Sequence, residues 1–118
     1  AVATSISHDS HNIIVVGTNE ADMAFAANQV VALNGGIVVA RDGAVSGQVP
    51  LAVAGIMSDE PLVEVNRKLE EAKEKAFAAG VNRNIDPFMT LSFMALPVIP
   101  TLRITTRGVF DVTTQRYI

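Results

Sequence analysis

Apolar residues recur with a spacing of three and four in two long segments of the chain, and this spacing predicts two main helices. The first is expected to begin after Asn19, a residue type favoured as an N-cap, and to stop at the Asn-Gly-Gly sequence of residues 34–36. The second is expected to follow Pro61, with Ser58 and Asp59 as cap residues, and to end at Gly80. Its narrow apolar face becomes mostly alanine toward the end, which suits close packing on a sheet.

Short β-branched or alternating apolar runs predict the strands. Residues 2–6 form one such run, and residues 13–16 form a second that suits a buried strand. Residues 37–40 and 45–51 flank Asp42-Gly43, a pair that predicts a tight hairpin turn. Residues 102–105 and 109–112 predict a second hairpin with its turn at 106–108.

A third, short helix is indicated where Asp86 and Pro87 provide an N-cap and a first helical residue. It would run toward Ala95, although a strand through the same apolar run is also possible. The pattern predicts an α+β fold, with two main helices and a possible third packed on a mostly antiparallel or mixed sheet. Without a repeat or a linker-like stretch, residues 1–118 are interpreted as a single domain.

Composition narrows the class of protein. The 118 residues are 49% hydrophobic and 18% charged, with a formal net charge of -3 and no cysteine. This composition favours a globular protein and argues against nucleic-acid binding, disulfides and thiolate metal sites. Without a membrane-length apolar run or a signal peptide, we expect a cytoplasmic protein that is not inserted in a membrane. The start at Ala1 without a methionine suggests a piece of a longer chain.

Polar chemistry is densest in residues 7–12, with the sequence SHDSHN, which contain both histidines of the chain. Imidazole and carboxylate groups together can bind a divalent metal or exchange protons near neutral pH. The same groups can also serve as hydrogen-bonding side chains of a structural loop, and both readings stay open. A catalytic metal centre needs at least three protein ligands, however, and the chain has only two histidines.

Four sequence blocks resemble successive blocks of the C-terminal domain of bacterial-type adenine deaminases, in the amidohydrolase superfamily. They occur in family order from residue 7 to residue 112, and the first and last are the most specific. The blocks are SHDSHNIIVVGTNEADMAFAANQV, GGIVVARDG, LAVAGIMSDEP and DPFMTLSFMALPVIPTLRITTRGVFDV.

The resemblance implies an enzyme of purine salvage that hydrolyses adenine to hypoxanthine and ammonia. In that family a binuclear centre of manganese, iron or zinc belongs to a separate barrel domain, so the isolated chain is expected to be inactive and to bind no metal. Its partners would be that barrel domain and further copies of the enzyme. No catalytic residue is assigned. Residues that could contact substrate or orient groups of the barrel are His8, Asp9, Ser10, His11 and Asn12, with Ser58, Asp59 and Asp86 as weaker candidates.

Two other interpretations remain. The chain could be a noncatalytic packing or oligomerisation domain, or a free-standing small-molecule-binding protein with a pocket of phenylalanine and methionine side chains from residues 88–94. If the chain contributes to deamination, as the resemblance implies, changing the histidines would alter the reaction rate. If the chain only packs or oligomerises, changing them would alter only stability or assembly. Purine binding by the isolated chain would indicate the third.

Overall fold

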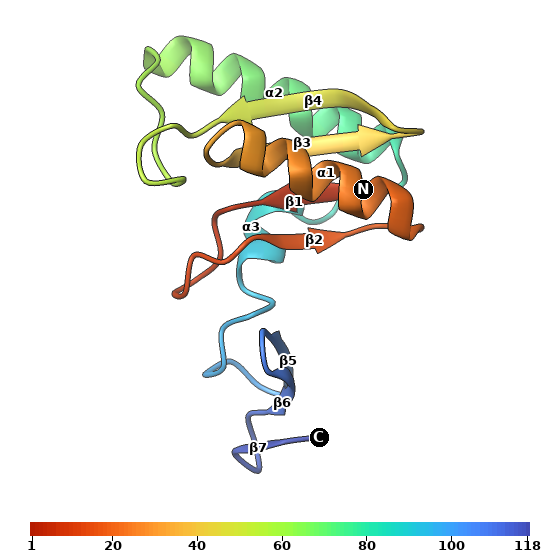
Figure 1. The fold of residues 1–118 in the computed structure, drawn as a ribbon, viewed down its shortest axis with the longest axis vertical. Helices are drawn as coiled ribbons and strands as arrows, with labels where there is room; N and C mark the ends of the chain where they lie inside the picture. Colours follow the sequence, from red (N-terminus) through yellow and green to blue (C-terminus); the bar gives the residue numbers. More distant parts are fainter.

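The computed structural model describes residues 1–118 and separates two antiparallel sheets (Figure 1). The larger sheet has the order β2-β1-β3-β4. Its strands are β1 (Val2–Thr4), β2 (Ile14–Val16), β3 (Gly36–Arg41) and β4 (Ala44–Pro50), and every pairing is antiparallel. Three helices pack on this sheet: α1 (Glu20–Ala32), α2 (Leu62–Ala78) and α3 (Pro87–Ser92). We call these seven elements the layered body, and they confirm the predicted α+β class.

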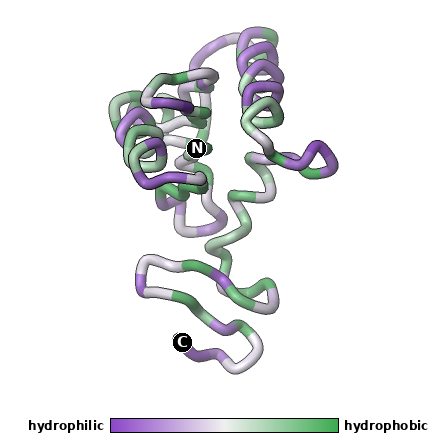
Figure 2. The backbone as a smooth tube through the Cα atoms, turned by 90° about the vertical axis from the view of Figure 1, so that its right-hand side faces the viewer, coloured by the Kyte–Doolittle hydropathy of each residue, from purple (hydrophilic) through white to green (hydrophobic).

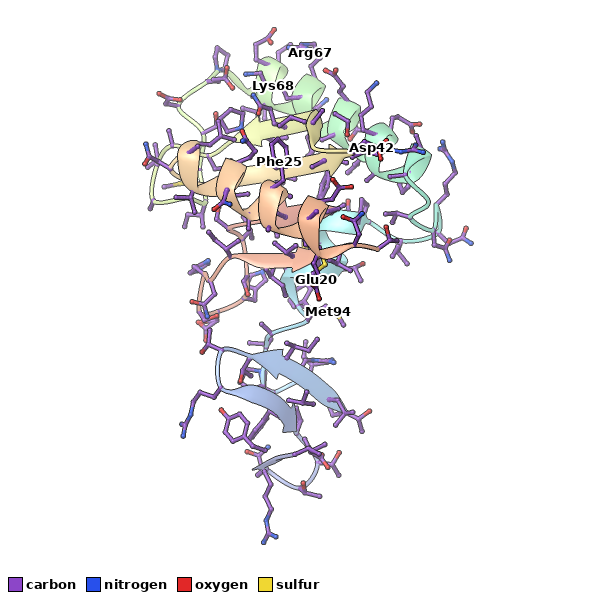
Figure 3. The ribbon with its side chains drawn as sticks, turned by 45° about the vertical axis from the view of Figure 1, so that its right-hand side comes forward. Glu20, Phe25, Asp42, Arg67, Lys68 and Met94 are labelled. Atoms are coloured by element: carbon purple, nitrogen blue, oxygen red, sulfur yellow. The ribbon has the colours of Figure 1, made fainter.

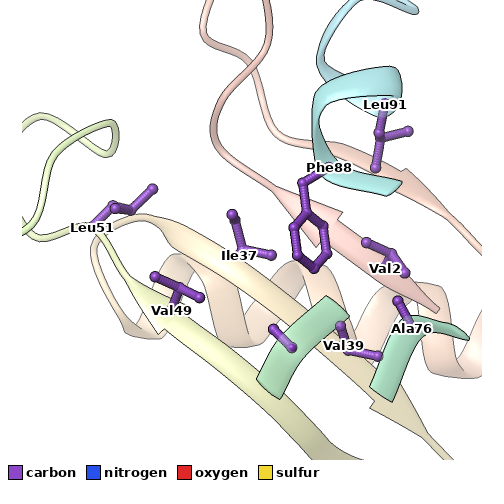
Figure 4. Packing of buried hydrophobic residues seen from close by; sticks show 9 residues of the cluster. Val2, Ile37, Val39, Val49, Leu51, Ala76, Phe88 and Leu91 are labelled. Atoms are coloured by element: carbon purple, nitrogen blue, oxygen red, sulfur yellow. The ribbon is translucent and has the colours of Figure 1, made fainter. Parts of the chain in front are cut away.

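The helices cover both faces of the larger sheet, with α1 on one side and α2 on the other (Figure 2). Strand alternation explains why two cores form. Ala3 and Val38 point toward α1, whereas Val2 and Val39 point toward α2 and α3. Phe88 of α3 lies at the centre of the second core (Figure 4).

The ends of the two long helices follow from local hydrogen bonding. The Asn19 side chain accepts the Asp22 backbone N–H at 2.8 Å, which confirms the predicted N-cap of α1. Helix α2 begins without a side-chain cap, contrary to expectation, because Pro61 occupies the N-cap position. The Ser58 hydroxyl accepts the Glu60 N–H instead, at 3.1 Å.

The hairpin of β3 and β4 turns at Asp42 and Gly43, whose φ angles of 53° and 71° are those of the turn predicted from the sequence. Helix α2 comes very close to β4 beside Gly47. A Cβ atom at Gly47 would lie 3.0 Å from the Ala72 Cα atom. The alanine-rich face of α2 therefore packs on the sheet at short range, as its sequence predicted.

The prediction of a buried strand at residues 13–16 is wrong, because strand β2 is partly exposed. It lies at the edge of the sheet, pairs only with β1, and leaves the Val16 side chain 51% exposed. The apolar run after Asp86 is helical rather than extended, but α3 ends at Ser92 and does not reach Ala95.

The second predicted hairpin forms a sheet of its own, in the order β5-β6-β7. Its strands are β5 (Leu102–Thr105), β6 (Gly108–Asp111) and β7 (Arg116–Tyr117), of which β7 was not predicted. This C-terminal sheet projects from the layered body beyond α3 (Figure 1). None of the helices has the length and apolarity needed to cross a membrane.

Candidate functional site

Residues 7–12, which we call the polar loop, connect β1 to β2 and are held against the C-terminal end of α3. The His8 backbone N–H donates to the Ser92 carbonyl at 2.8 Å, and the His11 N–H donates to the Ser7 carbonyl at 2.7 Å. The His8 ring stacks on the Phe93 ring, with centroids 4.7 Å apart and an interplanar angle of 16°. Both main-chain and side-chain contacts thus fix the base of the loop.

The outer part of the polar loop presents its side chains to solvent. Asp9, Ser10, His11 and Asn12 are exposed, and the hydrogen bond between their side chains joins Asn12 Nδ2 to Ser10 Oγ at 3.2 Å. Ser7, in contrast, is fully buried, and its hydroxyl has no hydrogen-bond partner in the chain. The loop therefore combines an anchored base with a rim of carboxylate, hydroxyl, imidazole and amide groups.

The donor set of the chain does not fit a metal centre of the kind that the resemblance implies. No group of three or more His, Cys, Asp or Glu side chains lies close enough together to hold a metal ion. The two imidazoles of the polar loop have only Asp9 beside them as a further ligand of this kind in the loop. We derive no chemical step through a metal bound to these residues.

Asp86 has a structural role that its sequence position predicted in part. Its Oδ1 atom accepts the N–H groups of Phe88 and Met89 at 3.0 and 2.9 Å, and its Oδ2 atom lies 3.1 Å from Lys73 Nζ. Burial raises the pKa of Asp86, but the hydrogen bonds from Met89 and Lys73 outweigh burial and leave the pKa lowered. The hydrogen bond to Asp86 raises the pKa of Lys73 in turn. Asp86 caps the N-terminal end of α3 and ties it to α2, whereas the polar loop contacts the opposite end of the helix, at Ser92 and Phe93.

Ser58 and Asp59 lie outside the polar loop, in the segment between β4 and α2. The Ser58 hydroxyl accepts a backbone N–H within its own turn, and Asp59 is exposed. Neither side chain forms a hydrogen bond or ion pair with residues 7–12. The structure therefore does not join these two candidates to the five of the polar loop.

The phenylalanine and methionine residues of 88–94 do not line one common pocket. Phe88, in the core, and Met89 both line a small hollow of about 160 Å3 beside Asp86, whereas Phe93 stacks on His8. Met94 lines a groove of about 370 Å3 between β2, α3 and β5, where Thr90 is the only polar lining residue. This groove offers little with which to orient a polar heterocycle.

Sequence reasoning missed the contacts that support the polar loop. The Ser92 carbonyl and the Phe93 ring are the supporting groups, and only the position of Phe93 at the end of a predicted apolar run was visible in the sequence. The contacts of Asp22 were also missed. Its carboxylate accepts the N–H groups of Asp42 and Gly43 at 3.1 and 2.8 Å, and thereby joins α1 to the β3–β4 turn.

Comparison with known proteins gives this geometry its context. The family model described as "Adenine deaminase C-terminal domain" matches residues 1–116. The chain is 46% identical over 118 residues to an adenine deaminase of Bacillus subtilis, covering all of this chain and 20% of the relative. It is 51% identical over 112 residues to an adenine deaminase of Dehalococcoides mccartyi, covering 95% of this chain and 19% of the relative. An adenine deaminase of Nitratidesulfovibrio vulgaris is 49% identical over 115 residues, with 97% and 20% covered. The chain thus spans about a fifth of the length of these relatives and belongs to the adenine deaminase C-terminal domain family.

Proposed function

We propose that this chain supports the hydrolytic deamination of adenine to hypoxanthine and ammonia as the C-terminal domain of an adenine deaminase. The metal centre, with manganese, iron or zinc, belongs to a separate barrel domain of the same enzyme. Residues 1–118 act as one accessory unit of a cytoplasmic, homo-oligomeric enzyme of purine salvage. The family match and the adenine deaminases to which the chain is similar support this proposal. Within the chain, we propose that the polar loop contributes to the active site.

The observation that carries the proposal is the contrast between the base and the rim of the polar loop. His8 is fixed by the stack on Phe93 and by its backbone hydrogen bond to Ser92, whereas Asp9 and His11 are exposed. A fixed backbone with unoccupied polar side chains is the arrangement needed to position a substrate or another domain's groups without a large entropy cost.

Three of the rim side chains suit a purine site in different ways. The His11 imidazole can donate a hydrogen bond from one ring nitrogen and accept one at the other. The Asn12 amide both donates and accepts, which matches the alternating ring nitrogens and exocyclic amine of adenine. Asp9 accepts only when it is ionised, so it suits the amine or a donor of the barrel domain.

The experiment is steady-state kinetics of His11→Ala in the full-length enzyme, with metal content and thermal unfolding measured in parallel. We expect kcat/KM to fall about ten- to hundredfold while metal content and unfolding temperature stay near those of the unchanged enzyme. Glu20→Ala is the matched control, because it removes an exposed polar side chain at the start of α1 that is not among the candidate site residues. Unchanged kinetics in His11→Ala would remove the proposed role of the loop.

His8 requires a pair of variants because its ring also stacks on Phe93. His8→Phe retains an aromatic stack and removes the imidazole nitrogens, whereas His8→Ala removes both. If His8 only supports the loop, His8→Phe should keep the turnover that His8→Ala loses. Loss of turnover in both variants, with normal folding, indicates that the nitrogens themselves are used.

The alternative function, a noncatalytic packing or oligomerisation domain, is favoured by the exposed apolar side chains of the C-terminal sheet. Under this alternative, substitutions in the polar loop change neither kcat nor KM. Substitutions in the C-terminal sheet change stability or subunit assembly instead. The kinetics of His11→Ala therefore separate the two functions.

A further inference from the structure

We propose that one apolar face of the C-terminal sheet, together with the groove beside it, is the surface on which this domain packs against the remainder of the same polypeptide. This inference rests on the proposed function, in which the chain is one domain of a longer adenine deaminase. It adds the location of the interdomain contact.

The face is formed by side chains that the strand register places on the same side of the sheet. Leu102 and Ile104 lie on one side of β5, and Val109 of β6 is paired with Ile104. The same register puts Asp111 and Arg116 on this side at one end of the sheet, where the Asp111 carboxylate accepts the N–H groups of its own turn. The Ile118 N–H donates to the Val109 carbonyl at 3.0 Å, which continues the register beyond β7 and puts Ile118 beside Val109. The four apolar residues, which we call the apolar face, have exposed fractions of 49%, 61%, 39% and 81% in chain order.

The opposite face of the C-terminal sheet is covered by its own side chains. Phe110 and Tyr117 make an edge-to-face contact with centroids 5.1 Å apart, and the Arg107 guanidinium lies 5.2 Å from the Tyr117 ring centroid. Arg103, on the same side as Phe110, donates to the carbonyls of its own segment. One face is therefore closed by aromatic and arginine side chains, and the other is open.

The C-terminal sheet lacks the burial that would make it stable alone. Val112 is the only buried residue between positions 97 and 118. Small sheets become stable when a hydrophobic face packs on a helix or on another sheet. The open apolar face therefore needs a cover that residues 1–118 do not supply.

The apolar face continues into the groove against the layered body. Ile104 lines this groove together with Met94 and Val16, and the Ile104 N–H donates to the Met94 carbonyl at 3.1 Å. Met94 lies at the junction of the two parts (Figure 3). Strand β2, at the edge of its sheet, contributes Ile14, Val15 and Val16 to the same groove. A single partner surface can thus cover the sheet face and the groove.

We take the remainder of the enzyme to be the cover of the apolar face because the relatives are about five times longer than this chain. Adenine deaminases that match 95–100% of this chain do so over only 19–20% of their own length. A surface in the same polypeptide is present at high effective concentration, so it covers an exposed apolar face before a separate molecule does. A second copy of the chain is the competing occupant.

The first test compares backbone hydrogen exchange of the peptide spanning residues 101–112 in the full-length enzyme and in the 118-residue chain. We expect exchange in the full-length enzyme to be slower by about tenfold or more, because the covered sheet opens less often. Equal exchange in both proteins would overturn the inference. Protection that appears in the 118-residue chain with rising concentration, together with dimers in sedimentation, would overturn it in favour of a second copy.

The second test places charge on the face in the full-length enzyme, with the double variant Ile104→Asp and Val109→Asp. Exchange of peptide 101–112 should return to the rate of the 118-residue chain. The matched control is Leu62→Asp with Val63→Asp, since these side chains are 82% and 77% exposed at the start of α2. The control should leave the exchange of peptide 101–112 unchanged, and an equal effect of both double variants would contradict a specific contact.

These measurements need no deaminase activity, so the inference and the proposed function fail separately. Slow exchange in the full-length enzyme, with normal kinetics for His11→Ala, would support the packing surface and remove the catalytic contribution of the polar loop. Lowered turnover in His11→Ala, with equal exchange of peptide 101–112 in both proteins, would support the catalytic contribution of the polar loop and remove the packing surface.

Discussion

The layered body and the C-terminal sheet are both built from antiparallel strands, but only the body covers its sheet. Helices lie on both faces of the larger sheet, and Val38 and Val39 are 0% exposed on its two sides. In the C-terminal sheet, Ile104 is 61% exposed. The difference shows that strand pairing alone does not define a folded unit, and that an apolar face left open indicates a missing neighbour.

The largest expected difference between the two regions comes from truncating one phenylalanine in each. Phe88 lies in the core of the layered body, so Phe88→Ala should cost about 3–5 kcal/mol of unfolding free energy in the 118-residue chain. Phe110 packs mainly on Tyr117, so Phe110→Ala should cost about 1 kcal/mol or less. Urea unfolding followed by far-UV circular dichroism gives both values. Equal losses would mean that the C-terminal sheet belongs to the same cooperative core.

A smaller effect is expected where α2 approaches β4. Gly47→Val places a side chain against the Ala72 backbone and should destabilise the body by about 1–3 kcal/mol through overpacking. Gln48→Val is the matched control, because Gln48 is the next residue along β4 and its side chain is exposed. Thermal unfolding of the two variants measures the difference. A neutral Gly47→Val would mean that α2 can move away from the sheet without loss.

The smallest expected effect is a difference in acid sensitivity. The Gly43 N–H bond, followed by the Asn19 side chain, lowers the pKa of Asp22 in the body, and the Thr114 N–H bond lowers the pKa of Asp111 in the C-terminal sheet. A lowered pKa stabilises the folded state above the ordinary carboxyl pKa of about 4, and this stabilisation is lost as pH falls below it.

Asp22→Asn should therefore flatten the decline in stability of the 118-residue chain between about pH 5 and pH 3. Asp111→Asn should leave that decline unchanged, because its region contributes little to global unfolding. Chemical unfolding at a series of pH values measures both slopes. If only Asp111→Asn flattened the dependence of stability on pH, the C-terminal sheet, and not the layered body, would contribute the acid-sensitive part of the unfolding free energy.

Most of the layered body could be predicted because its signals are local. Asn19 caps α1 and Asp42-Gly43 forms the hairpin turn, and each needs only its neighbouring residues. The edge position of β2 was mispredicted because a β-branched run is equally compatible with a buried strand and with a strand that borders an apolar groove. The separation of the second sheet depends on tertiary contacts that periodicity does not encode.

The residue types of the candidate site could be predicted from the sequence, but the contacts that hold the polar loop in place could not. Polar density identified the polar loop, and the structure shows its base held by Phe93 and Ser92, a contact across more than 80 positions of sequence. Asp86 had the residue type of a site and the position of a helix cap, and the structure shows the cap. Packing between residues distant in sequence holds the polar loop, whereas local hydrogen bonds determine the role of Asp86.

The measurement that tests the account most directly is ammonia release from adenine in the presence of manganese or iron. It compares the 118-residue chain with the same chain joined to the remainder of an adenine deaminase. The account predicts ammonia release only from the joined protein, because the 118 residues hold no group of three potential metal ligands. Metal-dependent release by the 118-residue chain alone would contradict the claim that this domain supports chemistry carried out elsewhere in the enzyme.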